Sequence, residues 1–398
     1  MRGTWLVVLS FWMMMAQGRA FTLEPHRLEL SSGKAITLSV PQGWDITVAA
    51  TGMKRPRFMA FSPDGRLFLG DMYNKGDTRL GHVYVLDDYD PAQGRFGKWT
   101  AYLSKQRNPN SVAFFTDPQG GSWIYVALTD DLLRYPYRPG DLAPSGAPQT
   151  LASFPAYGLN YKYGGWHLTR TVLLGEDGKL YVSVGSSCDS CPEKKGEIRA
   201  CILQMDPDGS NERVYASGIR NAVGMKWAEG RLIVTAMGAD KLGDDLPLEA
   251  VYSIQDGANY GWPFCYNSPD GYRPDPKYAP QDRPAGVCER APAPYWTYLA
   301  HAAPLGLEYF DASYGAPLTG HYLVSFHGSS KKTLGHGYRV VRMLKGEKGE
   351  DFITGFRGQG PRGKVFGRPC DILKDGRGGF FLTDDFNGVL YHLQKKGP

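Results

Sequence analysis

Six positions along the chain carry polar side chains that could hold an anion or accept a proton, and each lies just before an apolar strand-like run. Arginine binds carboxylates through two parallel hydrogen bonds, so arginines gathered around one point predict a planar, anionic ligand. A histidine beside that ligand could accept a proton, and His167 is the candidate. For any single position the alternative is an ordinary polar loop residue. The six positions are Arg57, Asn110, His167, Arg220 with Asn221, His301 and Arg368.

None of these positions is acidic, which bears on the metal chemistry they could support. A hydrolase that activates water with an axial Ca²⁺ needs Asp, Glu and Asn oxygens as ligands. The cationic set therefore favours a carboxylated ligand over a hydrolytic metal centre.

The run that follows each position belongs to a repeated unit of an apolar strand, a turn with Asp or Gly, and a second strand rich in aromatic and β-branched residues. Such a pair cannot bury both faces alone, so the copies must stack, as in a β-propeller. Six copies predict an all-β, six-bladed propeller, and most copies are followed by third and fourth strand candidates. The copies begin at Phe58, Ser111, Thr171, Gly224, Gly306 and Asp371.

The last copy is one strand short, because the chain ends at Pro398 after VLYHLQKK. The early stretch AITLSVPQGWDITVAATG has strand-like runs and belongs to no copy. We expect it to complete the sixth blade and close the ring, which would remove an exposed sheet edge. In such a ring the first strand of each blade lines a central channel. The six polar positions should therefore meet at one end of it.

Residues 262–300 lack the repeat and are rich in Pro, Tyr and Asp, which predicts an insertion between blades four and five. An even number of cysteines in an exported chain favours disulfides, and Cys265 with Cys288 is the expected pair within the insertion. The motif Cys188-Asp-Ser-Cys191 is followed by Pro192, where a haem attachment site would have histidine. A single such motif is a weak zinc signal, so a local or long-range disulfide is favoured.

Residues 1–20 resemble a secretory signal peptide, with Arg2, an apolar run from Trp5 to Met15, and small residues before a cut after Ala20. The run is too short for a membrane anchor. Residues 21–398 then form the propeller, in the periplasm or outside the cell. Loss of Arg2 and Arg19 lowers the formal charge from +5 by two, to +3. This mild basicity does not indicate a nucleic-acid-binding protein.

Several motifs together carry a family resemblance, among them GWHLTR, ASGIRNAVGM, LGDDL, GANYGWPFCY, HAAPLGLEY and FGRPCDI. From about Ile36 to Leu393 the chain resembles the glucose/sorbosone dehydrogenase family, and its aldose- and sorbosone-type branches most. These are six-bladed propellers that use pyrroloquinoline quinone (PQQ) with Ca²⁺. The resemblance implies oxidation of an aldose or a related sugar hydroxyl or aldehyde, with electrons passed to an external acceptor.

The resemblance also implies roles for individual residues. His167 matches the catalytic base and Arg220 the arginine that polarises the quinone carbonyl, with Asn221 beside it. The backbone carbonyls of Gly238 and Ala239 match ligands of the PQQ-bound Ca²⁺. The further cofactor contacts implied are Arg57, His301, Lys331 and Arg368.

Oxidation of an alcohol needs a base of near-neutral pKa, which histidine supplies, and an electron acceptor, which no side chain supplies. No nucleotide-binding GxGxxG follows an N-terminal strand, so a different cofactor is required. Asp244 and Asp245, with Asp240 and Glu249, either assist a calcium site or form an ordinary acidic loop.

Two departures from the family pattern keep other functions open. Ser186 follows Gly185 where soluble glucose dehydrogenase has an acidic residue, and Ser330, Lys331 and Lys332 follow HGS where sorbosone-type members have Trp-Asn-Arg. The alternatives are a Ca²⁺-dependent lactonase on a similar propeller and a non-catalytic binding propeller.

Overall fold

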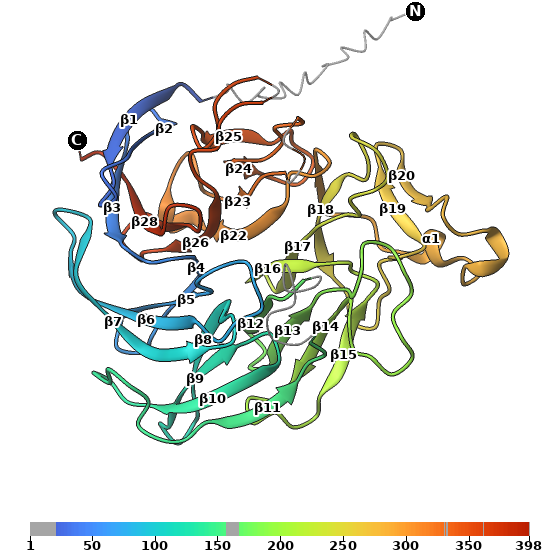
Figure 1. Ribbon diagram of the computed structural model, residues 1–398, viewed down its shortest axis with the longest axis horizontal. Coiled ribbons are helices and arrows are strands. Elements are labelled where there is room, and N and C mark those ends of the chain that lie inside the picture. The colour runs from blue at the N-terminus through green and yellow to red at the C-terminus, as the bar shows by residue number, and fades with distance from the viewer. Residues whose placement is uncertain (1–20, 157–166, 330, 332, 361, 398) are drawn as a thin grey trace, which may run out of the picture.

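The computed structural model describes residues 21–156, 167–329, 331, 333–360 and 362–397. Within these residues, six four-stranded antiparallel sheets are arranged around one axis (Figure 1). The predicted six-bladed β-propeller is therefore confirmed. The expected signal peptide, residues 1–20, lies outside the described residues.

Each blade runs outward from a strand that lines the axis. Blades one and two consist of β4 (Pro56–Phe61), β5 (Leu67–Asp71), β6 (Gly81–Asp90) and β7 (Arg95–Gln106), and of β8 (Ser111–Thr116), β9 (Ser122–Ala127), β10 (Asp131–Tyr137) and β11 (Gln149–Ser153). Blades three and four consist of β12 (Arg170–Leu174), β13 (Leu180–Val184), β14 (Cys201–Met205) and β15 (Arg213–Ser217), and of β16 (Ala222–Ala228), β17 (Arg231–Ala236), β18 (Glu249–Ile254) and β21 (Trp296–Tyr298). Blades five and six consist of β22 (Pro304–Phe310), β23 (His321–Phe326), β24 (Arg339–Met343) and β25 (Glu350–Ile353), and of β26 (Pro369–Lys374), β27 (Phe380–Asp384), β28 (Val389–Lys395) and β3 (Trp44–Thr51).

The repeated unit forms the two innermost strands of each blade. Its turn places a glycine at positive φ in each of the six copies, for example at Gly65 (81°) and Gly178 (75°). L-residues rarely adopt this conformation, so glycine makes the tight turn accessible. The innermost strands β4, β8, β12, β16, β22 and β26 contact one another around the axis. The residues that precede them therefore lie at one mouth of the channel.

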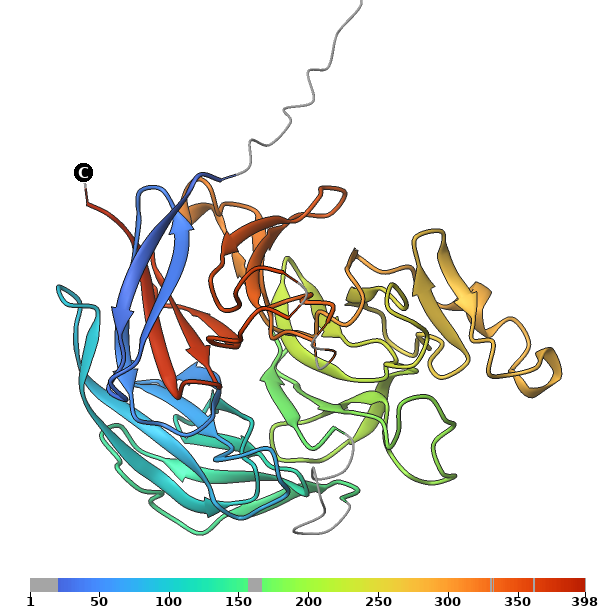
Figure 2. The same ribbon diagram turned by 45° about the horizontal axis from the view of Figure 1, so that its top comes forward.

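The N-terminal strand β3 closes the ring, as predicted. It pairs antiparallel with β28, from Trp44 opposite Lys395 to Thr51 opposite Val389. The two strands, blue and red, lie side by side in both views (Figures 1 and 2). The two ends of the chain are thus joined within one blade, because β3 supplies the outer strand that the C-terminal part of the chain lacks.

The first strand-like run of the N-terminal stretch has a different partner. Residues 35–41 form β2 (Ala35–Pro41), which pairs with β1 (Leu23–Glu29) in a separate hairpin. This hairpin packs beside β25, where Ser39 and Thr354 form a bridge. The sixth blade needed only one strand, so the other run covers the outer part of blades five and six.

The segment expected as an insertion projects from the rim of blade four (Figure 1). Its last residues differ from the prediction, because β21 at 296–298 pairs with β18 as the fourth strand of that blade. The insertion therefore lies within blade four rather than between blades four and five. A three-residue strand is too short to show an alternating pattern. The insertion contains β19 (Cys265–Ser268), β20 (Gly271–Pro274), the 3-10 turn η2 (Pro280–Asp282) and α1 (Val287–Arg290); another 3-10 turn, η3 (Ala312–Tyr314), follows β22.

The apolar core of the described residues is divided among the spaces between neighbouring blades. One cluster joins Phe68 and Val83 of blade one to Val112 and Ile124 of blade two. Equivalent clusters lie between each following pair, and the last joins blade six to blade one. Because the middle strands are covered on both faces, strands such as β5 and β13 are buried at every residue.

The expected Cys265–Cys288 disulfide is present, and of the two alternatives left open for the Cys188–Cys191 motif the structure has the local disulfide. Cys265 pairs with Cys288 within the insertion, and Cys188 pairs with Cys191 in a local loop. Cys201 and Cys370 are buried thiols. Among the described residues, no helix has the length and apolar character that crossing a membrane requires.

Ring closure should contribute strongly to stability through Trp44 of β3. The Trp44 side chain is 2% exposed and its ring lies 5.3 Å from Phe352 and 5.9 Å from Phe380. Trp44→Ala should lower the free energy of unfolding by about 3–5 kcal/mol, measured by denaturant titration. Trp99→Ala on β7 is the control, since Trp99 is 38% exposed. Equal losses in the two variants would contradict the closing role of β3.

Candidate functional site

A pocket of about 230 Å³ opens at the mouth where the six polar positions were expected to meet. Arg57 enters it from blade one, His167 precedes the inner strand of blade three, and Asn221 that of blade four. The pocket thus gathers residues more than 100 positions apart in the sequence. Its lining is Arg55, Arg57, Met72, Lys75, His167, Leu168, Thr169, Asn221, Val223, Met237, Leu305 and His327.

His167 is held in an unusual backbone conformation against blade three. Its φ is 50°, in the left-handed region, which costs free energy for a non-glycine residue. A Cβ on Gly185 would lie 2.5 Å from the Cβ of His167. Glycine at 185 therefore allows the close approach that places the imidazole at the pocket.

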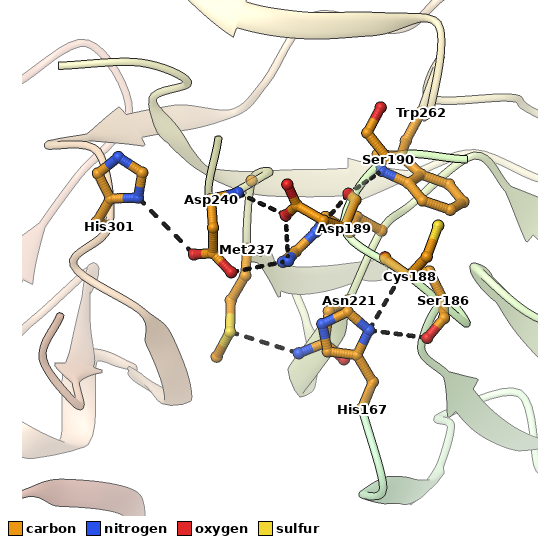
Figure 3. Close-up of polar contacts among 12 residues, drawn as sticks. His167, Ser186, Cys188, Asp189, Ser190, Asn221, Met237, Asp240, Trp262 and His301 are labelled. Carbon is orange, nitrogen blue, oxygen red and sulfur yellow. Dashed lines mark hydrogen bonds and ion pairs between the residues drawn. The ribbon is translucent and has the colours of Figure 1, made fainter. Parts of the chain in front are cut away.

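One hydrogen bond determines which ring nitrogen of His167 carries the proton. Nδ1 lies 2.9 Å from the carbonyl oxygen of Ser186, which can only accept, so Nδ1 donates (Figure 3). The Ser186 hydroxyl oxygen lies 3.0 Å from the same nitrogen and itself donates to the carbonyl of Cys188. The neutral ring is thus the Nδ1–H tautomer, and Nε2 carries the lone pair that can accept a proton.

The surroundings keep that ring neutral. Burial lowers the pKa of His167 well below its usual value, and the charges of Arg220, Arg170 and Arg199 lower it further. The contact with the Ser186 backbone acts in the opposite direction. His167 is therefore unprotonated near neutral pH, which is the state that a proton acceptor needs.

Arg220 lies behind the pocket between two carboxylates. Its Nη2 donates to Asp189 Oδ1 at 2.9 Å and to Asp240 Oδ2 at 3.2 Å. Its Nε donates to the backbone carbonyl of Asp189 at 3.0 Å. Asp240 lies between Asp189 and His301 in Figure 3, and its Oδ1 is 3.9 Å from His301 Nδ1.

A second group of charges surrounds the buried carboxylate of Asp385. Arg55 Nη2 and Arg57 Nη1 each lie 2.6 Å from Oδ2, and His327 Nε2 donates to Oδ1 at 2.8 Å. Burial alone would raise the pKa of Asp385, but His327 and the two arginines hold it far below its usual value. Asp385 therefore stays ionised and orients two arginines at the pocket.

Positive charge exceeds negative charge around Asp385. Arg368 and Lys75 lie in the same group as Arg55 and Arg57. Burial lowers the pKa of Lys75, and the neighbouring charges of Arg368 and Arg55 lower it further. Like charges this close repel one another, so an anionic ligand would be favoured at this mouth.

The remaining predicted residues lie around the pocket rather than in its lining. Arg368 Nη1 contacts His327 Nδ1 at 3.3 Å, and its Nη2 donates to the Tyr338 hydroxyl at 3.1 Å. His301 Nε2 and Lys331 Nζ both lie 2.7 Å from the carbonyl of Gly243.

Gly238 and Ala239, the expected calcium ligands, lie with Arg220 along a narrow adjacent cavity of about 40 Å³. The backbone N–H of Gly238 donates to Glu249 at 2.8 Å, and burial raises the pKa of Glu249 to about 7. Asp244 pairs with Lys331. In the described part of the chain, no three His, Cys, Asp or Glu side chains are grouped as metal ligands.

Comparison with known proteins identifies the family. A family profile described as TrAA12-like matches residues 38–396. The chain belongs to the TrAA12-like family. It is also 24% identical over 332 residues, 72% of each chain, to a pyrroloquinoline quinone-dependent sugar dehydrogenase of Hypocrea jecorina (strain QM6a).

Solved structures share the fold of this TrAA12-like chain at low sequence identity. The iodide structure of the Trichoderma reesei carbohydrate-active enzyme of family AA12 has a TM-score of 0.71 at 19% identity, over 89% of this chain and 97% of that one. The holo form of the PQQ domain of a pyranose dehydrogenase from Coprinopsis cinerea also has a TM-score of 0.71 at 19% identity, over 90% and 97%. The expected resemblance to PQQ-dependent sugar dehydrogenase propellers is confirmed at the family level.

One set of site residues in the TrAA12-like chain was not predicted to meet the six polar positions, although Asp240 was named as a possible calcium-site residue. In an antiparallel four-stranded blade, the loop between the second and third strands opens at the same mouth as the loop before the first strand. Reading the residues after each second strand would have pointed to them. They are Lys75, Asp189, Asp240, His327 and Asp385.

His327 should make stability depend on pH. Burial lowers its pKa to about 4, because it outweighs the attraction of Asp385, and Arg368 donates to its Nδ1. The unfolded chain binds this proton near pH 6.5 and the folded chain only near 4, so acidification favours unfolding between these values.

Protonation of His327 should lower the free energy of unfolding of the wild type by about 3 kcal/mol between pH 6.5 and pH 4. His327→Gln should lack that loss, so the two proteins should converge as the pH falls, measured by denaturant titration at each pH. His26→Gln on β1 is the control. A constant difference between wild type and His327→Gln would show that His327 does not titrate in this way.

Proposed function

We propose that this chain is a PQQ-dependent sugar dehydrogenase that oxidises an aldose or a related sugar hydroxyl or aldehyde and passes the electrons to an external acceptor. The observation that carries the proposal is a neutral His167, with its lone pair on Nε2, at a cationic pocket. Family membership supports the same activity.

The donor set fits PQQ, which carries three carboxylates and an ortho-quinone. Arg55, Arg57 and Lys75 line the pocket, and one carboxylate, Asp385, lies among them. Arginines of this kind bind carboxylates through paired hydrogen bonds. Asn221 lines the same pocket, and its buried Oδ1 has no hydrogen-bond partner among the described residues.

Under this proposal, Arg57, Arg368 and Asn221 hold the cofactor. Arg55 and Lys75 would also contact it, because they line the same pocket. His301 and Lys331 lie next to Asp240 and Gly243 and would hold its far side. The backbone carbonyls of Gly238 and Ala239 would supply oxygen ligands to Ca²⁺, which prefers hard donors. PQQ, when bound, supplies the two-electron acceptor that no side chain provides.

The chain's own residues would move and stabilise the proton. Nε2 of His167 accepts the proton of the sugar hydroxyl, and the Nδ1–H bond to Ser186 keeps the ring oriented and disperses the new positive charge. Arg220 would donate hydrogen bonds to the quinone carbonyl and polarise it. The buried carboxylate of Asp189 balances its charge.

We also propose that the protein works in the periplasm or outside the cell, after cleavage of residues 1–20. Two disulfides in the described residues support this, because such bonds persist in oxidising compartments.

The activity can be tested with purified protein, PQQ, Ca²⁺, a panel of aldoses and an artificial electron-accepting dye. We expect dye reduction that requires both PQQ and sugar. His167→Gln should lower kcat by about 100- to 10,000-fold, the usual contribution of a general base. PQQ should still bind to this variant, measured by its absorbance change, since His167 is not among the cationic groups. His26→Gln should behave as wild type.

The absence of any absorbance or thermal change with PQQ would overturn the proposal. Hydrolysis of a lactone without PQQ would select the lactonase alternative instead.

A further inference from the structure

The four-residue loop closed by the Cys188–Cys191 disulfide contacts Arg220 through Asp189 and approaches His167 through Ser186. Cys188, Asp189 and Ser190 of this loop are labelled in Figure 3. None of its residues precedes an inner strand, and the proposed function uses only the charge of Asp189. Its contacts nevertheless reach both candidate catalytic side chains.

Asp189 binds Arg220 with two different groups. Its backbone carbonyl accepts from Nε at 3.0 Å, and its carboxylate Oδ1 accepts from Nη2 at 2.9 Å. Oδ1 also accepts from the backbone N–H of Asp240 at 2.6 Å. Asp189 and Arg220 are 7% and 5% exposed, so the pair is shielded from solvent. Because Asp189 accepts hydrogen bonds from both Nε and Nη2 of Arg220, it determines the orientation of the guanidinium plane.

The same loop reaches His167 through Ser186. The hydroxyl of Ser186 donates to the carbonyl of Cys188 at 2.7 Å, and its oxygen lies 3.0 Å from His167 Nδ1. Ser186, the residue at which the chain departs from the soluble glucose dehydrogenase pattern, is thus oriented by the first residue of the disulfide loop. The positions of His167 and Arg220 therefore both depend on contacts with the loop, through Cys188 and Asp189 respectively.

The insertion of blade four holds the loop from the other side. Trp262 Nε1 donates to the carbonyl of Asp189 at 3.1 Å. Ser190 donates to Asp275 Oδ2 at 3.0 Å, and Lys277 Nζ donates to the carbonyl of Ser190. Residues 188–191 belong to no strand, so sheet hydrogen bonds do not fix their backbone. The Cys188–Cys191 disulfide closes this segment into a small ring and so limits its conformations.

We propose that the Cys188–Cys191 loop is the positioning element of the site, and that Asp189 is the positioning residue for Arg220. The catalytic part of this inference rests on the proposed function, whereas the positioning of Arg220 can be tested without cofactor. The disulfide restricts the backbone, and Asp189 transmits that restriction to the guanidinium group. Small displacements of a catalytic group reduce turnover strongly, even when binding is retained.

The first experiment uses the apoprotein labelled with ¹⁵N-arginine. The Nε–H of Arg220 should exchange slowly with water, since it is buried and bonded to Asp189. Arg220→Lys identifies the signal by removing it. In Cys188→Ser/Cys191→Ser and in Asp189→Asn, exchange should be at least about 10-fold faster.

The matched control is Asp256→Asn, which removes a surface carboxylate paired with Arg213. Asp256→Asn should leave the Arg220 signal unchanged. Unchanged exchange in both test variants, at wild-type folding, would overturn the proposal.

The second experiment measures steady-state kinetics and equilibrium binding of PQQ. Asp189→Asn should lower kcat on the order of 10- to 100-fold and leave KM for the sugar nearly unchanged. PQQ binding should not weaken, because the substitution removes a negative charge beside an anion site. A general structural defect would instead weaken PQQ binding and raise KM together, and that result would overturn the positioning role.

The two proposals can fail separately. Faster Arg220 exchange together with no sugar oxidation by the wild type would support the positioning role and overturn the proposed function. Sugar oxidation at the wild-type rate in both test variants would support the proposed function and overturn the positioning role.

Discussion

The hydrogen bond from His167 Nδ1 to the carbonyl of Ser186 is the interaction on which the site depends. It leaves the lone pair on Nε2, and the buried, arginine-rich surroundings keep the ring unprotonated. It exists because β12 and β13 hold residues 167 and 186 side by side, with glycine at 185 where a side chain would clash. The propeller in turn holds this pair opposite Arg55, Arg57 and Lys75, which come from blade one.

Charge is balanced differently on the two sides of the pocket. On one side Arg220 is paired with Asp189 and Asp240, so its charge is largely neutralised in the protein itself. On the other side several cations share the carboxylate of Asp385, and the pKa of Lys75 is lowered by burial and further by the charges of Arg368 and Arg55. An anion would relieve the repulsion among these cations. This difference in charge between the two sides favours a ligand that places its carboxylates near blade one and a neutral polar group near Arg220 of blade four.

The repeated unit was sufficient to predict the six blades, because its apolar runs indicate buried strands and its turn residues separate them. Closure by an N-terminal strand was predicted from the strand that the last copy lacks. The repeated unit also predicted that Arg57, His167 and Asn221 meet, since position within a repeat determines position in the ring. The place of Asp189 and Asp385 after second strands could have been read from the repeat in the same way. Their pairing with Arg220 and Arg57 could not, because these loops share no common pattern and only the fold brings the partners together. Similarly, β21 is too short to show periodicity, and β1 carries too few apolar residues to reveal the hairpin that takes up β2.

The most direct test of the account is the protonation state of His167, measured from its ¹⁵N chemical shifts in the apoprotein between pH 8 and 5, with His167→Gln to assign the signals. The account predicts a neutral ring with the proton on Nδ1, still unprotonated at Nε2 as the pH passes through 6.5. A ring that carries its proton on Nε2, or that titrates near 6.5 like an exposed histidine, would contradict it.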